Sequence, residues 1–182
     1  IKSGAIINDR VIIGDGTIIR ENSVIGGYGF GLERDESGEP VRIPHIGGVK
    51  IGNNVEIGAL CTVVSGTIEP TLVGDGSKTD DHVHIAHNCV IGKNCLITAC
   101  VEISGSVWIG DNVWIGPNAS IMNGIKLGKC CFIGLGAVVT KSVEENSVVT
   151  GNPARDIELI KHENIVLKRM MEKYTKDNFL VE

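Results

Sequence analysis

A six-residue repeat of aliphatic side chains constrains this chain more than any other feature. From Val73 to Val139 every sixth residue is aliphatic, apart from Thr79, and the register never slips. A period of six excludes a helix of about 3.6 residues per turn. It suits short strands separated by sharp bends, each with two inward side chains, so that three strands make one triangular coil. The repeat therefore predicts a solenoid whose coils hydrogen-bond to one another.

Small residues complete the repeat. A small or branched residue precedes many of the aliphatic positions by two, and glycine often follows directly, as at Gly74, Gly92 and Gly110. The same pattern opens the chain at Ile7 and resumes at Ile51. The chain holds 24 glycines and only 4% aromatic residues, too few large side chains for a conventional sandwich or α/β core. We expect stacked aliphatic layers, with glycine relieving crowding where the backbone turns.

Two interruptions and a change of pattern divide the chain. Residues 26–48 are too many for a bend and predict a projecting loop, either a lid or substrate wall or a passive decoration. A shorter insertion at 66–71 shifts the register. Residues 158–173 carry apolar side chains at near-helical spacing. We expect a β-helix domain over 1–155 and a helical cap over 156–182, which could also bundle with its symmetry mates.

Charge and hydropathy exclude several classes of partner. The formal charge of -5 gives no basic field for nucleic acid, so small molecules are the expected partners. No run of about 18 apolar residues predicts a membrane span, and no charged-then-apolar leader precedes Ile1. Four cysteines occupy inward repeat positions and two occupy bends: Cys61, Cys89, Cys95 and Cys131, then Cys100 and Cys130. This placement favours reduced core thiols and a cytoplasmic protein over disulfides or a zinc cluster.

The densest polar chemistry lies in residues 79–88, which contain three histidines and two carboxylates. In one interpretation His87, at an outward bend, is a general base for an amine or hydroxyl that attacks a thioester. His82 and His84 would then orient it, line the acceptor site or be merely solvated, while Asp80 or Asp81 could hold its tautomer. His45, in the projecting loop, could reach the same groove, but no role is assigned to it.

Two other interpretations of this stretch stay open. The three imidazoles could bind zinc, as in the γ-class carbonic anhydrases, which share a similar solenoid; that class spreads its histidines over successive coils, so we predict no metal site. Alternatively, all three histidines are surface residues without a function. The sequence favours the acid-base interpretation.

Residues 1–155 resemble the hexapeptide-repeat acyltransferase superfamily, whose members are left-handed β-helices that form trimers with active sites between subunits. Within it, Gly29-Phe30-Gly31, Arg42 to Gly47 and Ile85-Ala86-His87-Asn88 resemble the N-acyltransferases of lipid A synthesis, which acylate a UDP-glucosamine derivative from acyl carrier protein. This resemblance implies that His87 is the catalytic base and Asp80 its acidic neighbour. His82, His84 and Asn88 are the expected acceptor-binding residues.

The second half is similar to acetyl-CoA-dependent sugar and serine acetyltransferases, through Trp114-Ile115-Gly116-Pro117, Ile133 to Lys141 and Gly151 to Arg155. This resemblance implies that Pro117 and Leu135 meet the pantetheine arm, and that Thr140, Lys141 and Arg155 lie near the nucleotide and its phosphates.

The expected protein is an all-β, left-handed parallel β-helix with a projecting loop and a short C-terminal helix, working as a homotrimer without a permanent cofactor. It would transfer an acyl group, which we expect to be acetyl, from coenzyme A to the amine of a nucleotide-linked amino sugar. This reaction would belong to the synthesis of cell-surface polysaccharide or lipopolysaccharide. The alternatives are a lipid A-type N-acyltransferase using hydroxyacyl-acyl carrier protein and a γ-carbonic-anhydrase-like metal hydratase.

Overall fold

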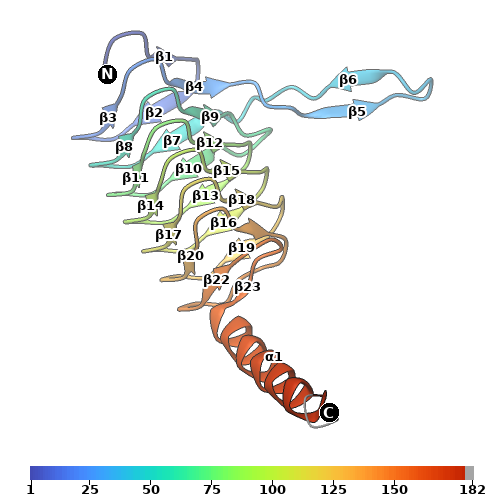
Figure 1. Ribbon diagram of the computed structural model, residues 1–182. Coiled ribbons are helices and arrows are strands. Elements are labelled where there is room, and N and C mark those ends of the chain that lie inside the picture. The colour runs from blue at the N-terminus through green and yellow to red at the C-terminus, as the bar shows by residue number, and fades with distance from the viewer. Residues whose placement is uncertain (179–182) are drawn as a thin grey trace.

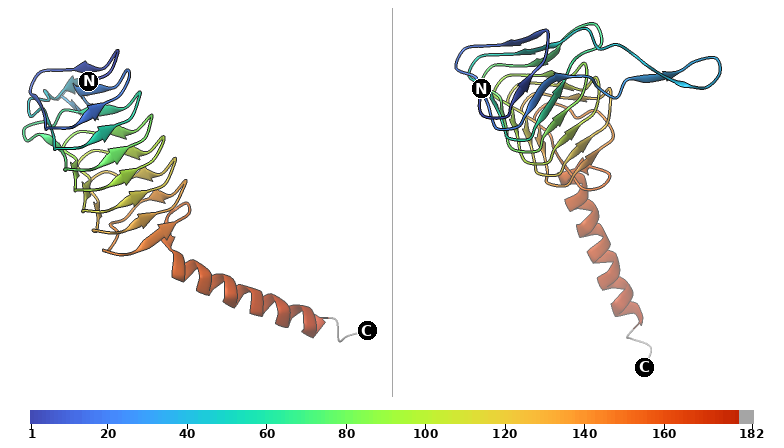
Figure 2. Two further views of the ribbon diagram at one scale, coloured as in Figure 1. Left: turned by 90° about the vertical axis from the view of Figure 1, so that its left-hand side faces the viewer. Right: turned by 90° about the horizontal axis from the view of Figure 1, so that it is seen from above.

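The computed structural model is a triangular prism of short parallel strands, from which a two-stranded ribbon and a helix project (Figure 1). The view from above shows the triangular outline and the ribbon leaving one corner (Figure 2). The structure describes the backbone of residues 1–178 and the side chains of residues 1–175. The predicted left-handed parallel β-helix is confirmed.

Three parallel sheets form the faces of the prism, and successive strands along the chain pass from face A to face B to face C. Face A contains β1 (Ile6–Ile7), β4 (Val24–Gly27), β9 (Thr62–Val64), β12 (His84–Ile85), β15 (Glu102–Ile103), β18 (Ser120–Ile121) and β21 (Val138–Val139). Face B contains β2 (Val11–Ile13), β7 (Val49–Ile51), β10 (Thr71–Val73), β13 (Val90–Ile91), β16 (Trp108–Ile109) and β19 (Lys126–Leu127). Face C contains β3 (Ile18–Ile19), β8 (Glu56–Ile57), β11 (Lys78–Thr79), β14 (Leu96–Ile97), β17 (Trp114–Ile115), β20 (Phe132–Ile133), β22 (Val148–Thr150) and the antiparallel β23 (Arg155–Asp156).

The bends between faces share one backbone conformation. In the regular coils the residue three positions after each inward aliphatic has positive φ, for example Asn88 (59°) and Asn94 (54°). Asparagine tolerates this left-handed region better than most residues, and glycine fills it at Gly76. The glycines that directly follow the aliphatics have a different role, since a Cβ on Gly110 would lie 2.6 Å from the nitrogen of Lys129 in the next coil. They permit the close approach of coils, whereas the bend itself is made two residues later.

The interior is the predicted stack of aliphatic layers. The inward isoleucines from Ile85 to Ile133 are buried, and so are Cys61, Cys89, Cys95 and Cys131, which confirms these four as core thiols. Burial raises the pKa of the Cys89 and Cys131 thiols to about 11. Cys100 and Cys130 are exposed at positive-φ bends, where the sequence placed them.

The two interruptions leave the prism at the corner between faces A and B. Residues 26–48 form the projecting loop, whose outer part is an antiparallel ribbon of β5 (Leu32–Arg34) and β6 (Pro40–Arg42). The base of this loop is tied down by Arg42, which donates to the Gly29 carbonyl at 2.9 Å, and by Ile43, whose N–H donates to the Gly31 carbonyl at 3.0 Å. The loop base therefore returns onto the prism while the ribbon extends away (Figure 1).

Helix α1 (Ile157–Asn178) begins where Asp156 accepts hydrogen bonds from the N–H groups of Glu158 and Leu159. It contacts β22 and β23 and then extends away from the prism (Figures 1 and 2), so in the single chain it does not lie across the last coil. Its apolar side chains, such as Leu167 and Met171, are exposed because nothing in the described part of their own chain packs against them. No described helix is long and apolar enough to cross a membrane.

Candidate active site

The corner between faces A and B stacks a column of residues, one from each coil. Each follows an inward aliphatic of face A by two positions, and the pairing of β9, β12, β15, β18 and β21 sets them in line. The column consists of Ser65, His87, Gly105, Asn123 and Lys141. Because neighbouring strands are about 4.8 Å apart, His87 and Lys141 lie roughly 14 Å apart along this corner. His87, the predicted base, and Lys141, which is predicted to bind the acyl donor, therefore share one edge of the prism.

His87 lies half-buried against Gly105 of the next coil. A Cβ on Gly105 would lie 2.7 Å from both Cε1 and Nε2 of His87, so glycine provides the space beside this nitrogen. Burial, and then the neighbouring His45 and His84, lower the pKa of His87 below its usual 6.5. The imidazole is therefore neutral near pH 7, as a general base must be.

His45, to which the sequence assigned no role, packs edge-on against His87. The ring centroids are 5.4 Å apart with an angle of 77° between the planes, and only 4% of His45 is exposed. Its Nδ1 lies 2.9 Å from the carbonyl oxygen of Ile43. A Cβ on Gly31 would lie 2.5 Å from its Cε1, so the Gly29-Phe30-Gly31 segment makes room for this ring. Those two glycines were the available signal for a buried ring at the loop base.

The other two histidines of the cluster point elsewhere. His84 is half-buried on the outer surface of face A, where its Nδ1 forms a hydrogen bond with the Thr62 hydroxyl. His82 is exposed at the corner between faces C and A, in a bend with φ of 61°. Of these two histidines, only His84 contributes to lowering the pKa of His87. The described part of the chain contains no group of three His, Cys, Asp or Glu side chains that could hold a metal ion.

Asn88, predicted to bind the acceptor, is occupied by contacts within the chain. Its Oδ1 accepts a hydrogen bond from the Thr67 N–H at 2.7 Å, and its own N–H donates to the Thr71 hydroxyl at 3.0 Å. Asn88 thus holds the 66–71 insertion in place beside His87. Its acceptor-binding role stays a prediction, while its structural role is direct.

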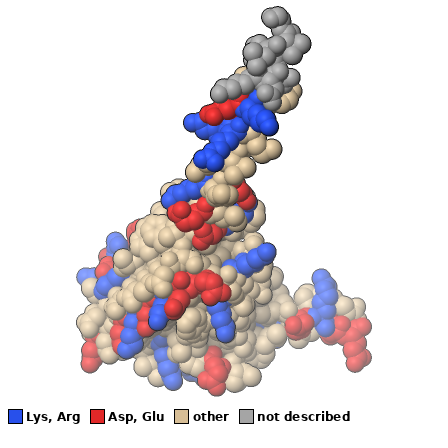
Figure 3. All heavy atoms as spheres, turned by 90° about the horizontal axis from the view of Figure 1, so that it is seen from below, with Lys and Arg blue, Asp and Glu red and all other residues tan. Residues whose placement is uncertain are grey.

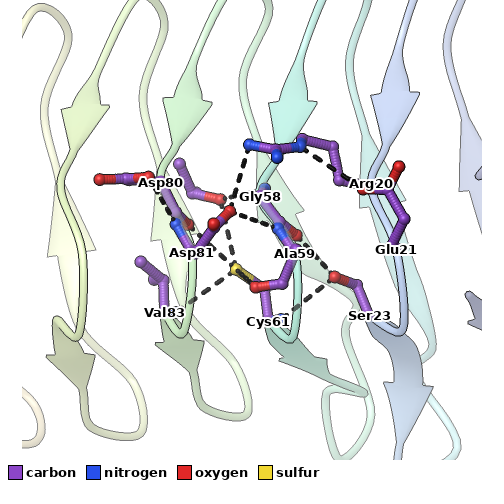
Figure 4. A network of polar contacts seen from close by, with 10 residues as sticks. Arg20, Glu21, Ser23, Gly58, Ala59, Cys61, Asp80, Asp81 and Val83 are labelled. Carbon is purple, nitrogen blue, oxygen red and sulfur yellow. Dashed lines mark hydrogen bonds and ion pairs between the residues drawn. The ribbon is translucent and has the colours of Figure 1, made fainter.

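Asp80 and Asp81 lie at the corner between faces C and A, and β12 separates them from His87. Asp81 accepts from the Ala59 N–H at 2.7 Å and pairs with Arg20 at 3.2 Å (Figure 4). Asp80 is exposed; its carboxylate accepts from the Asp81 N–H at 2.8 Å, and its backbone carbonyl accepts from the Cys61 thiol at 3.1 Å. Within one chain neither carboxylate holds the His87 tautomer, because the two groups occupy different corners. A role for Asp80 at His87 needs a second subunit.

The residues predicted to bind the acyl donor, coenzyme A, fall into two groups. Thr140, Lys141 and Arg155 line one cavity of ≈ 470 Å³ at the C-terminal end of the prism. Arg155 is not free there, because it forms a bidentate pair with Glu163 of α1, at 2.7 and 3.1 Å. Pro117 and the 76% exposed Leu135 lie one coil apart at the corner between faces C and A, joined by the Gly136 N–H, which donates to the Pro117 carbonyl at 2.8 Å. Charges of both signs are mixed on the end of the prism seen in Figure 3.

Comparison with known proteins agrees with this architecture. A family model described as bacterial transferase hexapeptide (six repeats) matches residues 70–105 and 106–141. A UDP-3-O-acylglucosamine N-acyltransferase of Coxiella burnetii is 54% identical over 80 residues, which are 44% of this chain and 23% of that protein. One from Leptospira biflexa is 44% identical over 84 residues, 46% of this chain and 24% of that protein. The chain therefore spans about a quarter of the curated relatives it matches.

A solved structure extends the likeness over most of the chain. LpxA from Acinetobacter baumannii superposes with a TM-score of 0.67 at 25% identity, covering 88% of this chain and 73% of that one. These matches confirm the resemblance drawn from the repeat and the histidine motif. The chain is a left-handed parallel β-helix, and its residues 70–141 match the bacterial transferase hexapeptide repeat.

Proposed function

We propose that this chain is an acyltransferase that moves an acyl group from a thioester to the amine of a nucleotide-linked amino sugar, in the synthesis of cell-surface polysaccharide or lipopolysaccharide. The half-buried, neutral His87 carries the proposal, since its Nε2 lies beside Gly105, where any side chain would collide with that nitrogen. The names of the curated relatives support an acylated UDP-glucosamine as the acceptor.

The proposed reaction is direct transfer in a ternary complex. The acceptor amine attacks the thioester carbonyl while His87 removes its proton, and backbone N–H groups stabilise the oxyanion that forms. The C–S bond then breaks, the amide is released, and His87 returns the proton to the departing thiolate. No covalent enzyme intermediate is needed, and the nearest thiol, Cys89, is buried with its pKa raised to about 11.

Coenzyme A is the first candidate donor, because Lys141 lines a cavity at the end of the His87 corner and suits a polyphosphate; Arg155 lines the same cavity but is paired with Glu163. Acyl carrier protein is the second, favoured by the identity to UDP-3-O-acylglucosamine N-acyltransferases. The six unpaired cysteines of the described chain and a cytosolic thioester donor favour a cytoplasmic location.

Calorimetric titration with acetyl-CoA, and separately with hydroxyacyl-acyl carrier protein, tests the donor. We expect saturable binding of acetyl-CoA that Lys141→Ala weakens about tenfold, through loss of one charge-assisted contact. Lys129→Ala, at another corner of the prism, is the matched control. Binding of the carrier protein alone would replace the first donor with the second, and transfer from neither would reject the proposed function.

We also propose a homotrimer. His87 and the Pro117–Leu135 pair occupy different corners, so a site that uses both requires two subunits. One side of helix α1 carries a row of side chains, apolar or aromatic except for Asn164, at alternating steps of three and four residues, which is the pattern of a coiled coil. We call this row the seam: Ile157, Ile160, Asn164, Leu167, Met171 and Tyr174. Three parallel copies of α1 would bury this seam.

Light scattering after gel filtration tests the assembly. We expect a trimer that Leu167→Glu weakens, whereas His162→Glu, on the opposite side of α1, leaves it intact. An unchanged Leu167→Glu trimer would reject the helix bundle, and a monomeric native chain would reject the trimer.

A further inference from the structure

Two ring nitrogens among the described residues are buried without a hydrogen-bond partner, and they belong to a contacting pair of histidines. They are Nε2 of His45 and Nδ1 of His87. A buried polar atom without a hydrogen-bond partner destabilises the folded chain. One hydrogen bond between these two nitrogens would satisfy both of them.

The tautomer of His45 follows from its other nitrogen. Nδ1 lies 2.9 Å from the Ile43 carbonyl oxygen, and a carbonyl can only accept a hydrogen bond. Nδ1 therefore carries the proton, which leaves Nε2 with a free lone pair. The atom that His45 directs into the buried pair is an acceptor.

We propose that His45 is a positioning residue, whose Nε2 accepts the Nδ1 proton of His87 and so leaves Nε2 of His87 unprotonated to act as the base. The base role of His87 rests on the proposed function, whereas its tautomer is a property of the folded chain alone. A hydrogen bond of about 2.9 Å between two imidazole nitrogens puts the ring centroids about 5 Å apart. The observed 5.4 Å is close to this value, so a reorientation of the rings is enough to form the bond.

The projecting loop is built to place His45 at this point. Gly29 and Gly31 leave the space that the ring fills, since a Cβ on either would lie 2.9 Å or less from a His45 ring atom. The Arg42 and Ile43 hydrogen bonds fix the two ends of the loop base. The loop thus brings a buried acceptor to the nitrogen of His87 that Asp80 and Asp81 do not reach within the chain.

The charge on His87 during turnover fits the same arrangement. When His87 takes the proton of the attacking amine it becomes an imidazolium, which can still donate a hydrogen bond from Nδ1 to a neutral His45. The titratable groups whose charge acts on His87 are His45 and His84. His45 therefore orients the base before transfer and solvates its charge afterwards.

Histidine-selective ¹⁵N labelling reports the His87 tautomer without any substrate. We expect Nδ1–H alone in the native chain and in His45→Gln, whose side-chain carbonyl can still accept. His45→Met, of similar length but without an acceptor, should give a mixture of both tautomers. In acyl transfer His45→Met should lower kcat roughly ten- to a hundredfold with KM within about threefold, whereas His45→Gln should stay within about threefold of native kcat.

A second variant leaves His45 itself unchanged. Gly31→Ala should displace the ring and give the same tautomer mixture, while Val41→Ala, on the exposed ribbon, should not. A single unchanged tautomer in both His45→Met and Gly31→Ala overturns the proposal, and so does a mixture in His45→Gln. If the native chain transfers no acyl group, the proposed function fails, but the tautomer result still decides the role of His45.

Discussion

The coils before and after β12 are built by the same repeat but differ in regularity. After β12 each coil takes 18 residues, since His84 pairs with Glu102 and Glu102 with Ser120. Before β12 the projecting loop and the 66–71 insertion interrupt the pattern, and the first coil is open to solvent, with Ile7 37% exposed where Ile115 is fully buried. The regular coils carry the core, and the interruptions gather the polar side chains around His87.

The two regions also supply different parts of the candidate site. The interrupted coils bring His45 and the Asn88-bound insertion to His87, whereas the regular coils provide Gly105 and the cavity at Lys141. Departures from a repeat are therefore the places to look for chemistry on such a scaffold.

Replacing His87, the proposed base, should give the largest effect: a loss of activity without a loss of stability. His87→Ala should lower kcat by about a thousandfold, because it removes the proton acceptor. His87 lies outside the inward aliphatic stack, so thermal stability should stay near native. Assays of the purified protein with each donor, beside a thermal melt, measure both quantities. Full activity in a folded His87→Ala protein would reject His87 as the base.

Equivalent repeat positions should differ in their effect on stability. Ile115→Ala creates a cavity in the buried stack and should reduce the free energy of unfolding by about 3 kcal/mol. Ile7→Ala, at the same repeat position of the open first coil, should cost less than about 1 kcal/mol. Urea unfolding followed by circular dichroism compares the two. Equal losses would mean that the first coil is covered in the assembled protein.

The pH dependence should show the smallest effect. Because the pKa of His87 is lowered from 6.5, kcat/KM should stay high as pH falls to 6.5 and reach half its plateau below that pH. His84→Gln removes one like charge, so it should move this midpoint up by a fraction of a unit, while His162→Gln should not. A native midpoint above 6.5 would contradict burial as the main influence on His87.

Much of the local structure was predictable because it depends on short-range periodicity. A six-residue period leaves only bends between short strands, so the inward isoleucines, the buried Cys61, Cys89, Cys95 and Cys131, and the exposed Cys100 and Cys130 followed from their place in the repeat. The helix after Pro153 followed from its spacing in the same way. These features need no knowledge of which coils lie side by side.

The contacts of the site depend on distances that the sequence does not contain. His45 and His87 are far apart in sequence, and they meet because the projecting loop, which follows β4, returns to the corner that His87 occupies. Asp80 is close to His87 in sequence but lies at another corner, because one strand of the prism separates them. The sequence by itself determined the prism, its core and its bends through periodicity. The tertiary structure alone decided which polar side chains share a corner, because the lengths of the interruptions set the register between coils.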